Sequence, residues 1–113
     1  MQPDTHDAGY LFDMLPFSRE AIAIVAETVA SPELRRRGLE RAISLIGEAA
    51  NHISRDFQAA HPKIPWSEII GQRHWLVHGY RGIEIKRLYE VVETQLPQLI
   101  QQLVDLVPTA PEP

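Results

Sequence analysis

Residues 39–57 read LERAISLIGEAANHISRDF, and this stretch decides the fold of the 113-residue chain. Its apolar residues recur at steps of three and four, which places them on one face of an α-helix. The apolar stripe consists of Leu39, Ala42, Ile43, Ile46, Ala49, Ala50, Ile53 and Phe57. Charged residues, such as Arg37, Arg41 and Glu48, lie off the stripe. The pattern predicts one continuous helix as the central element of the core.

The helix signals upstream of this stretch are equally clear. Ser31 suits an N-cap, Pro32 the first helical position and Glu33 the positive first turn. Before them, apolar residues recur at helical spacing from Tyr10 to about Val29. Pro16 lies inside that segment, so we expect a kink or a break near Leu15.

Two further helices follow the central one. The segment His61–Pro65 contains two prolines and ends the helical pattern, and Pro65 suits the start of a helix from Trp66 to about His78. After the Gly79–Gly82 break, a last helix is predicted from about Glu84 to Val107, with a bend at Pro97.

The chain shows neither strand alternation nor a repeat nor a linker between domains. The prediction is an all-α fold, a small antiparallel bundle of four to five helices. Residues 1–107 are expected to form a single domain, and the proline-rich tail 108–113 is expected to be disordered.

Composition limits the function classes. The net charge of −4 disfavours a broad, nonspecific nucleic-acid surface, so any RNA contact must be local. The basic residues that suit such a contact are Arg55, Arg73, Arg81, Lys86 and Arg87. Without cysteine the chain has no disulfide and no thiolate metal site. Neither a membrane-spanning apolar run nor a signal peptide is seen, so we expect a cytoplasmic protein without a membrane partner.

Residues 73–80, RHWLVHGY, concentrate the chemically capable side chains. The planar guanidinium of Arg73 suits phosphate oxygens, and His78 can exchange protons near neutral pH. In one regular helix, however, these two positions lie about 140° apart around the axis. They converge only if the helix ends at Gly79 and His78 turns away, or if two chains pair across a twofold axis.

Two other interpretations compete for these residues. His74 and His78 have a spacing that suits zinc, with a third ligand from His52, His61 or Glu48, but no acidic residue lies between them. We therefore predict neither a metal site nor a cofactor. Alternatively, Arg73 forms a structural ion pair with Glu68 or Glu84, and His78 caps its helix.

The remaining candidates have simpler interpretations. The large apolar and aromatic residues are expected in the core, and neither a serine nor a cysteine nucleophile motif occurs. The expected core residues are Phe57, Trp66, Trp75 and Leu88.

Several linked motifs appear in a fixed order along most of the chain. They are Ile46-Gly47-Glu48-Ala49-Ala50, Pro62-Lys63-Ile64-Pro65-Trp66, Ile69-Ile70-Gly71 and the Arg-x4-His-x-Tyr pattern from Arg73 to Tyr80. With these motifs the sequence resembles the HEPN superfamily, and specifically its HepT-like branch, from about Tyr10 to Val107.

The resemblance implies a homodimeric helical bundle that acts as a metal-independent RNA endonuclease, the toxin of a type VII-like toxin–antitoxin pair. It implies catalytic roles for Arg73 and His78. It also implies that a partner nucleotidyltransferase antitoxin of the MNT type silences the toxin by adding AMP to Tyr80. His74 replaces the asparagine common in this branch and would assist in proton transfer or phosphate orientation. Arg81 would add a phosphate contact.

Two other functions stay open at this point. A non-catalytic module that scaffolds or regulates a nucleotidyltransferase would agree better with the net acidity. A nucleotide-binding bundle would show nucleotide-dependent thermal stabilisation without cleavage.

Overall fold

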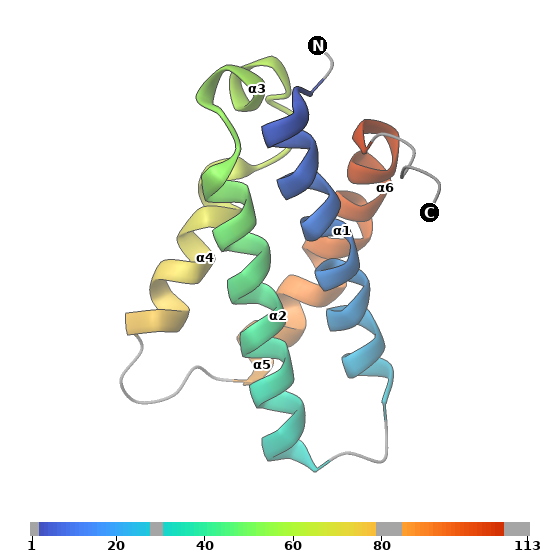
Figure 1. The fold of residues 1–113 in the computed structure, drawn as a ribbon. Coiled ribbons are helices and arrows are strands. Elements are labelled where there is room, and N and C mark those ends of the chain that lie inside the picture. Colours follow the sequence, from blue (N-terminus) through green and yellow to red (C-terminus); the bar gives the residue numbers. More distant parts are fainter. Residues whose placement is uncertain (1–2, 28–30, 79–84, 108–113) are drawn as a thin grey trace.

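A computed structural model describes residues 3–27, 31–78 and 85–107, and within these ranges the chain is helical without any strand. The elements are α1 (Thr5–Ala26), α2 (Pro32–His52), α3 (Arg55–Ala60), α4 (Trp66–His78), α5 (Ile85–Glu90), the π-helical turn η1 (Val91–Gln95) and α6 (Leu96–Leu106). The long helices alternate in direction, and α2 lies between α1 and α4 (Figure 1). The predicted all-α antiparallel bundle is confirmed; the predicted tail lies outside the described residues.

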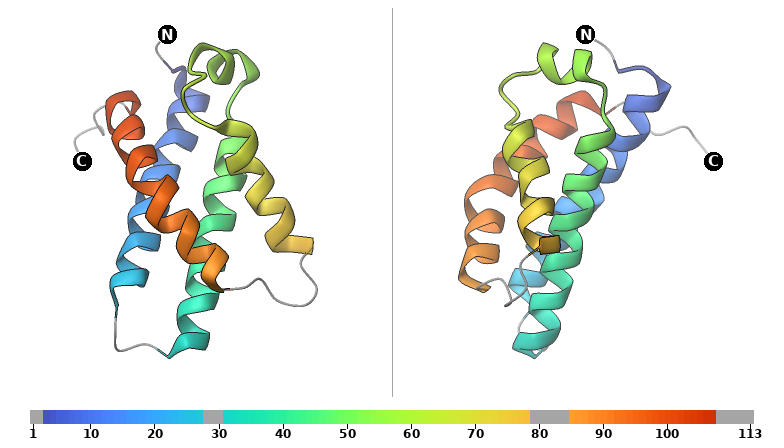
Figure 2. Two further views of the ribbon diagram at one scale, coloured as in Figure 1. Left: turned by 180° about the vertical axis from the view of Figure 1, so that it is seen from behind. Right: turned by 90° about the vertical axis from the view of Figure 1, so that its left-hand side faces the viewer.

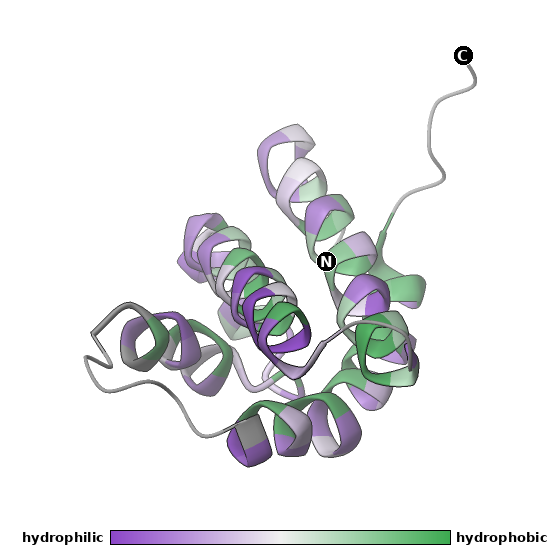
Figure 3. Cartoon of the chain, turned by 90° about the horizontal axis from the view of Figure 1, so that it is seen from below, coloured by the Kyte–Doolittle hydropathy of each residue, from purple (hydrophilic) through white to green (hydrophobic). Residues whose placement is uncertain are grey.

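Helix α2 is the central element, as predicted. Ser31 caps it, since its side-chain oxygen accepts a hydrogen bond of 3.2 Å from the backbone N–H of Leu34. The apolar faces of the helices turn inward (Figure 3). The fully buried large side chains include Leu11, Met14, Leu39, Ile43, Ile46, Phe57, Ile69, Leu88, Leu96, Leu99 and Leu103.

The predicted continuous helix through Phe57 is wrong, because α2 ends at His52. Ser54 starts α3: its hydroxyl oxygen accepts from the N–H of Phe57 at 3.2 Å. The backbone N–H and hydroxyl of Ser54 in turn donate to the buried carboxylate of Asp7, at 2.8 and 2.6 Å. These bonds satisfy the backbone N–H and the hydroxyl group of Ser54, so the chain can leave the helix at this residue. The apolar stripe nevertheless stays in one core, since Phe57 remains buried.

Helix α1 is longer than predicted and has no break. It begins at Thr5 rather than near Tyr10, because the carboxylate of Asp4 accepts from the N–H of Asp7 at 2.7 Å and caps it. Pro16 lies inside the uninterrupted helix, on its exposed side. There water can bind the backbone carbonyl that has lost its helical donor, so the proline is tolerated.

The predicted bend at Pro97 takes the form of the π-helical turn that directly precedes it. The N–H of Leu96 donates to the carbonyl of Val91, five residues back. Pro97 has no N–H and would clash with the carbonyl four residues before it, which a wider turn relieves. The segment from α5 through η1 to α6 crosses the α1–α2 pair obliquely (Figure 2).

Among the helices so described, none is both long and apolar enough to span a bilayer.

Candidate active site

Helix α4 carries the first six of the eight residues of the predicted motif and is fixed at its N-terminal end. It spans Trp66–His78, as predicted. The indole N–H of Trp66 donates to the carbonyl of His61 at 3.0 Å, and the ring packs edge-on to Phe57 at 6.4 Å. The predicted core positions of Phe57, Trp66 and Leu88 are confirmed; the side chain of Trp75 lies outside the described part of the chain.

Arg73 and His74 are both exposed on α4. In the part of the chain that the structure describes, Arg73 makes no ion pair, so the structural pairing with Glu68 is not formed. Glu84, the other predicted partner, lies outside that part. The guanidinium of Arg73 therefore presents its donors to solvent, where a phosphate could meet them.

Helix α4 continues through His78. The positions of Arg73 and His78 are thus about 140° apart around one regular helix axis. Both ways in which these side chains could converge, a turn of His78 at the helix end and the pairing of two chains, stay predictions. The side chain of His78, together with Tyr80 and Arg81, lies outside the described residues, so their roles stay predictions.

The basic residues do not all gather at the motif. Arg55 borders the same surface hollow as Trp66, at the N-terminal end of α4, and Arg73 lies seven residues after Trp66, about 10 Å along the helix axis. Lys86 and Arg87 are exposed on α5, which follows the motif in the chain. Arg55 thus lies at the opposite end of α4 from His78.

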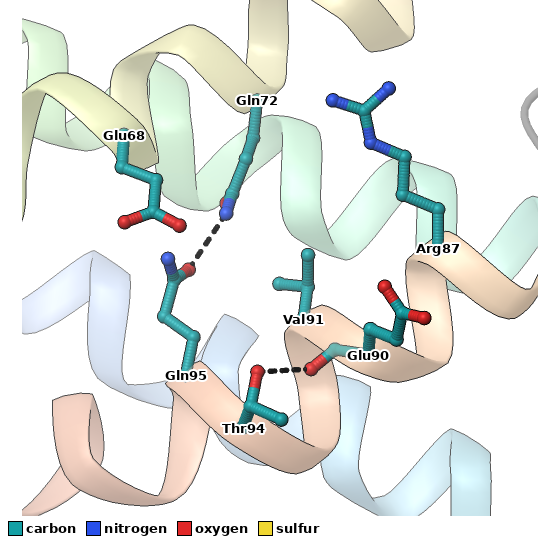
Figure 4. A pocket seen from close by; sticks show the side chains of 7 residues that line it. All are labelled: Glu68, Gln72, Arg87, Glu90, Val91, Thr94 and Gln95. Atoms are coloured by element: carbon teal, nitrogen blue, oxygen red, sulfur yellow. Dashed lines mark hydrogen bonds between the residues drawn. The ribbon is translucent and has the colours of Figure 1, made fainter.

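A cavity of about 230 Å³ lies between α4 and the α5–η1 segment. Its lining residues are Glu68, Gln72, Arg87, Glu90, Val91, Thr94 and Gln95. The amide of Gln72 donates to the side-chain oxygen of Gln95 at 2.9 Å across the gap (Figure 4). The sequence could not predict this cavity, because η1 forms one of its walls. Its two carboxylates would repel phosphate, and Arg73 does not line it.

Two of the three residues suggested as third metal ligands, His52 and His61, make other contacts. The ring of His52 stacks on Tyr10 at 4.8 Å, and the ring of His61 lies 4.3 Å from Phe57. Among the described residues, no three side chains of the metal-binding types converge.

The known proteins to which this chain is similar are named as ribonucleases. A protein of Methanocaldococcus jannaschii named "Putative RNase" is 29% identical over 84% of this chain and 91% of its own length. A "Probable ribonuclease HepT" of Thermococcus cleftensis is 41% identical over 52% of this chain and 54% of its own length. A "Putative RNase" of Caldanaerobacter subterraneus is 32% identical over 63% of each chain. No solved structure matches the chain.

The sequence model described as "Ribonuclease HepT-like" matches residues 17–106. The match runs from the middle of α1 to the end of α6 and so takes in every other helix of the bundle. The chain therefore belongs to the HepT-like ribonuclease family.

Proposed function

We propose that this chain is a cytoplasmic RNA endonuclease, the toxin of a type VII-like toxin–antitoxin pair, which uses Arg73 and His78 without a metal ion. The observation that carries the proposal is the exposed guanidinium of Arg73, which makes no ion pair with the described residues and lies five residues before a histidine at the end of α4, in a member of the HepT-like family. The relatives named as RNases support the same reaction class.

In the proposed reaction the 2′-oxygen of a ribose attacks the adjacent phosphorus, and His78 takes the proton of the hydroxyl group. Arg73 donates to the equatorial oxygens of the phosphorane, where negative charge accumulates. The bond to the 5′-oxygen then breaks, and this leaving group receives a proton from a second general acid. His74 supplies that acid. The products are a 2′,3′-cyclic phosphate and a 5′-hydroxyl.

We propose that the active unit is a homodimer. The support is geometric: on the regular helix α4 the backbone positions of Arg73 and His78 lie about 140° apart around the axis. Two chains related by a twofold axis can bring Arg73 of one copy next to His78 of the other. This pairing also concentrates positive charge locally on a protein with a net charge of −4.

The purified chain is expected to cleave single-stranded RNA in the presence of EDTA and to leave 2′,3′-cyclic phosphate ends. Gel analysis of a labelled RNA, with acid treatment to open the cyclic phosphate, measures both. A substrate with deoxyribose at the cleaved position is the matched control, because it lacks the attacking hydroxyl. Cleavage of that substrate at an equal rate, or cleavage only with added metal, would contradict the mechanism.

The proposed regulator is a cognate MNT-type nucleotidyltransferase that adds AMP to Tyr80. A phosphodiester on this residue would place negative charge two positions after His78 and repel RNA. Arg81, the next residue, would contact a substrate phosphate in the unmodified protein.

Co-expression with the adjacent nucleotidyltransferase is expected to raise the intact mass of the chain in steps of one AMP and to abolish RNA cleavage. Tyr80→Phe should keep the unmodified mass, with Tyr89→Phe as the matched control that is still modified. AMP addition to the Tyr80→Phe variant would contradict the assignment of the residue.

A non-catalytic module that regulates the nucleotidyltransferase is the alternative, and the net acidity favours it. Growth arrest when this chain is expressed alone, relieved by the partner, would distinguish the toxin from the module.

A further inference from the structure

At Gly47 of α2, the backbone of α4 lies so close that a side chain on this residue would clash with it. A Cβ atom at Gly47 would lie 2.9 Å from the carbonyl oxygen of Ile69 and 3.0 Å from the Cβ of Arg73. It would also lie 3.4 Å from the backbone nitrogen of Arg73. Two of these three atoms belong to the α4 backbone, and the third is fixed directly to it.

This contact cannot be relieved by a side-chain rotation. Ile69 and Arg73 are four residues apart, so they lie one turn apart on the same face of α4. Moving their backbone or Cβ atoms away from Gly47 requires a shift of the helix itself. Gly38, by contrast, meets only the flexible side chain of Ile24.

The position is otherwise a poor one for glycine. Gly47 is buried inside the 21-residue helix α2, and glycine in a helix interior is destabilising relative to alanine. The close approach of α4 gives the physical reason for its presence. Beyond this contact α4 diverges from α2 towards its C-terminal end (Figures 1 and 2). The contact at Gly47 thus lies on the part of α4 that precedes its last turn.

We propose that Gly47 is a positioning residue for Arg73. By allowing the backbones of α2 and α4 to touch, it sets the distance of Arg73 from the bundle and the direction in which the last turn of α4 projects. The inference rests on the proposed function, in which Arg73 must meet a phosphorane within hydrogen-bonding distance.

The test compares Gly47→Ala with Gly71→Ala. Gly71 lies in α4, two residues before Arg73, and a Cβ there would meet nothing within 4 Å. We expect Gly47→Ala to lower kcat for RNA cleavage by about tenfold or more, because misplacement of a catalytic group by a fraction of an ångström to 1 Å has effects of this order. KM should change by less than about twofold, since the RNA-binding surface remains. Gly71→Ala should keep both values.

A stabilised variant of the chain distinguishes a loss of activity caused by displacement of Arg73 from one caused by a less stable fold. Alanine at Gly9 and Gly71, which both have open space around the Cβ position, is expected to stabilise α1 and α4. Gly47→Ala in the Gly9→Ala/Gly71→Ala background should therefore fold cooperatively and still show the loss in kcat. Recovery of the wild-type kcat in this background would overturn the proposal.

A crystal structure of each variant gives a readout independent of activity. Gly47→Ala should shift α4 away from α2 by at least a few tenths of an ångström at Arg73, and Gly71→Ala should not. An unshifted α4 would overturn the positioning role. Absence of cleavage by the wild-type protein would instead refute the proposed function, and the two crystal structures would then decide the geometric inference alone.

Discussion

RNA cleavage by Arg73→Ala is expected to be about 100- to 1,000-fold slower than by the wild-type chain, the usual effect of removing one donor to a transition-state oxyanion. For His78→Ala the expected loss is about 100- to 10,000-fold, the range for removal of a general base or acid. These are the largest effects on activity that the proposed mechanism predicts. Initial rates on a fluorescent RNA oligonucleotide measure them.

The expected loss of cleavage rate in Arg73→Ala does not come from removing one positive charge as such, and the Arg19→Ala variant tests this. Arg19 is also exposed, but it lies on α1, and α2 separates α1 from α4 (Figure 1). The Arg19→Ala variant should cleave at the wild-type rate. Because Arg73 is exposed and makes no ion pair in the described part of the chain, Arg73→Ala should unfold at the wild-type temperature. Cleavage that survives both motif substitutions would refute the assignment.

Local signals in the sequence predicted the elements that position the site. The bounds of α4 agree with the prediction, since Pro65 marks its start and Gly79 follows its last residue. Ser31 and Pro32 likewise marked the start of α2. Such caps act within one helical turn, so a single sequence is sufficient to read them.

The structure differs from the sequence-based prediction where contacts between residues far apart in the chain override the local sequence pattern. The break at Ser54 depends on the buried carboxylate of Asp7, which lies 47 residues earlier in the chain. The apolar stripe continues across that break, and periodicity alone therefore predicts one helix. Similarly, the Gln72–Gln95 pair joins residues 23 apart, and no local rule predicts its partner or the cavity beside it.

Gly47 illustrates the same limit at the candidate site. The sequence placed this glycine in a motif of the central helix, but only the contact with Ile69 and Arg73 gives it a physical role. The angle between Arg73 and His78 shows the reverse case. The spacing of the two residues is enough to predict a separation of about 140° on a regular helix. Helix α4 ends at His78, next to Gly79, so a turn of His78 at the helix end and the pairing of two chains are both compatible with the backbone.

Assembly of the site across a dimer interface predicts that chains with different defects restore one another's activity. In a twofold dimer with shared sites, a heterodimer of Arg73→Ala and His78→Ala has one site that lacks both residues and one site that is intact. After free exchange in an equal mixture, half of the dimers are heterodimers. The mixture should therefore recover about one quarter of the wild-type rate, although each variant alone is nearly inactive.

The matched control mixes Arg73→Ala with the Arg73→Ala/His78→Ala double variant. No chain in that mixture supplies Arg73, so no site is complete and the rate should not rise. Native mass spectrometry of chains with different isotope labels shows whether heterodimers have formed. If heterodimers form and the first mixture stays inactive, each site is built within one chain. The 140° separation would then have to be overcome by a change at the end of α4 on RNA binding. Recovery can occur only if Arg73 and His78 act across the interface, because neither variant chain contains both residues.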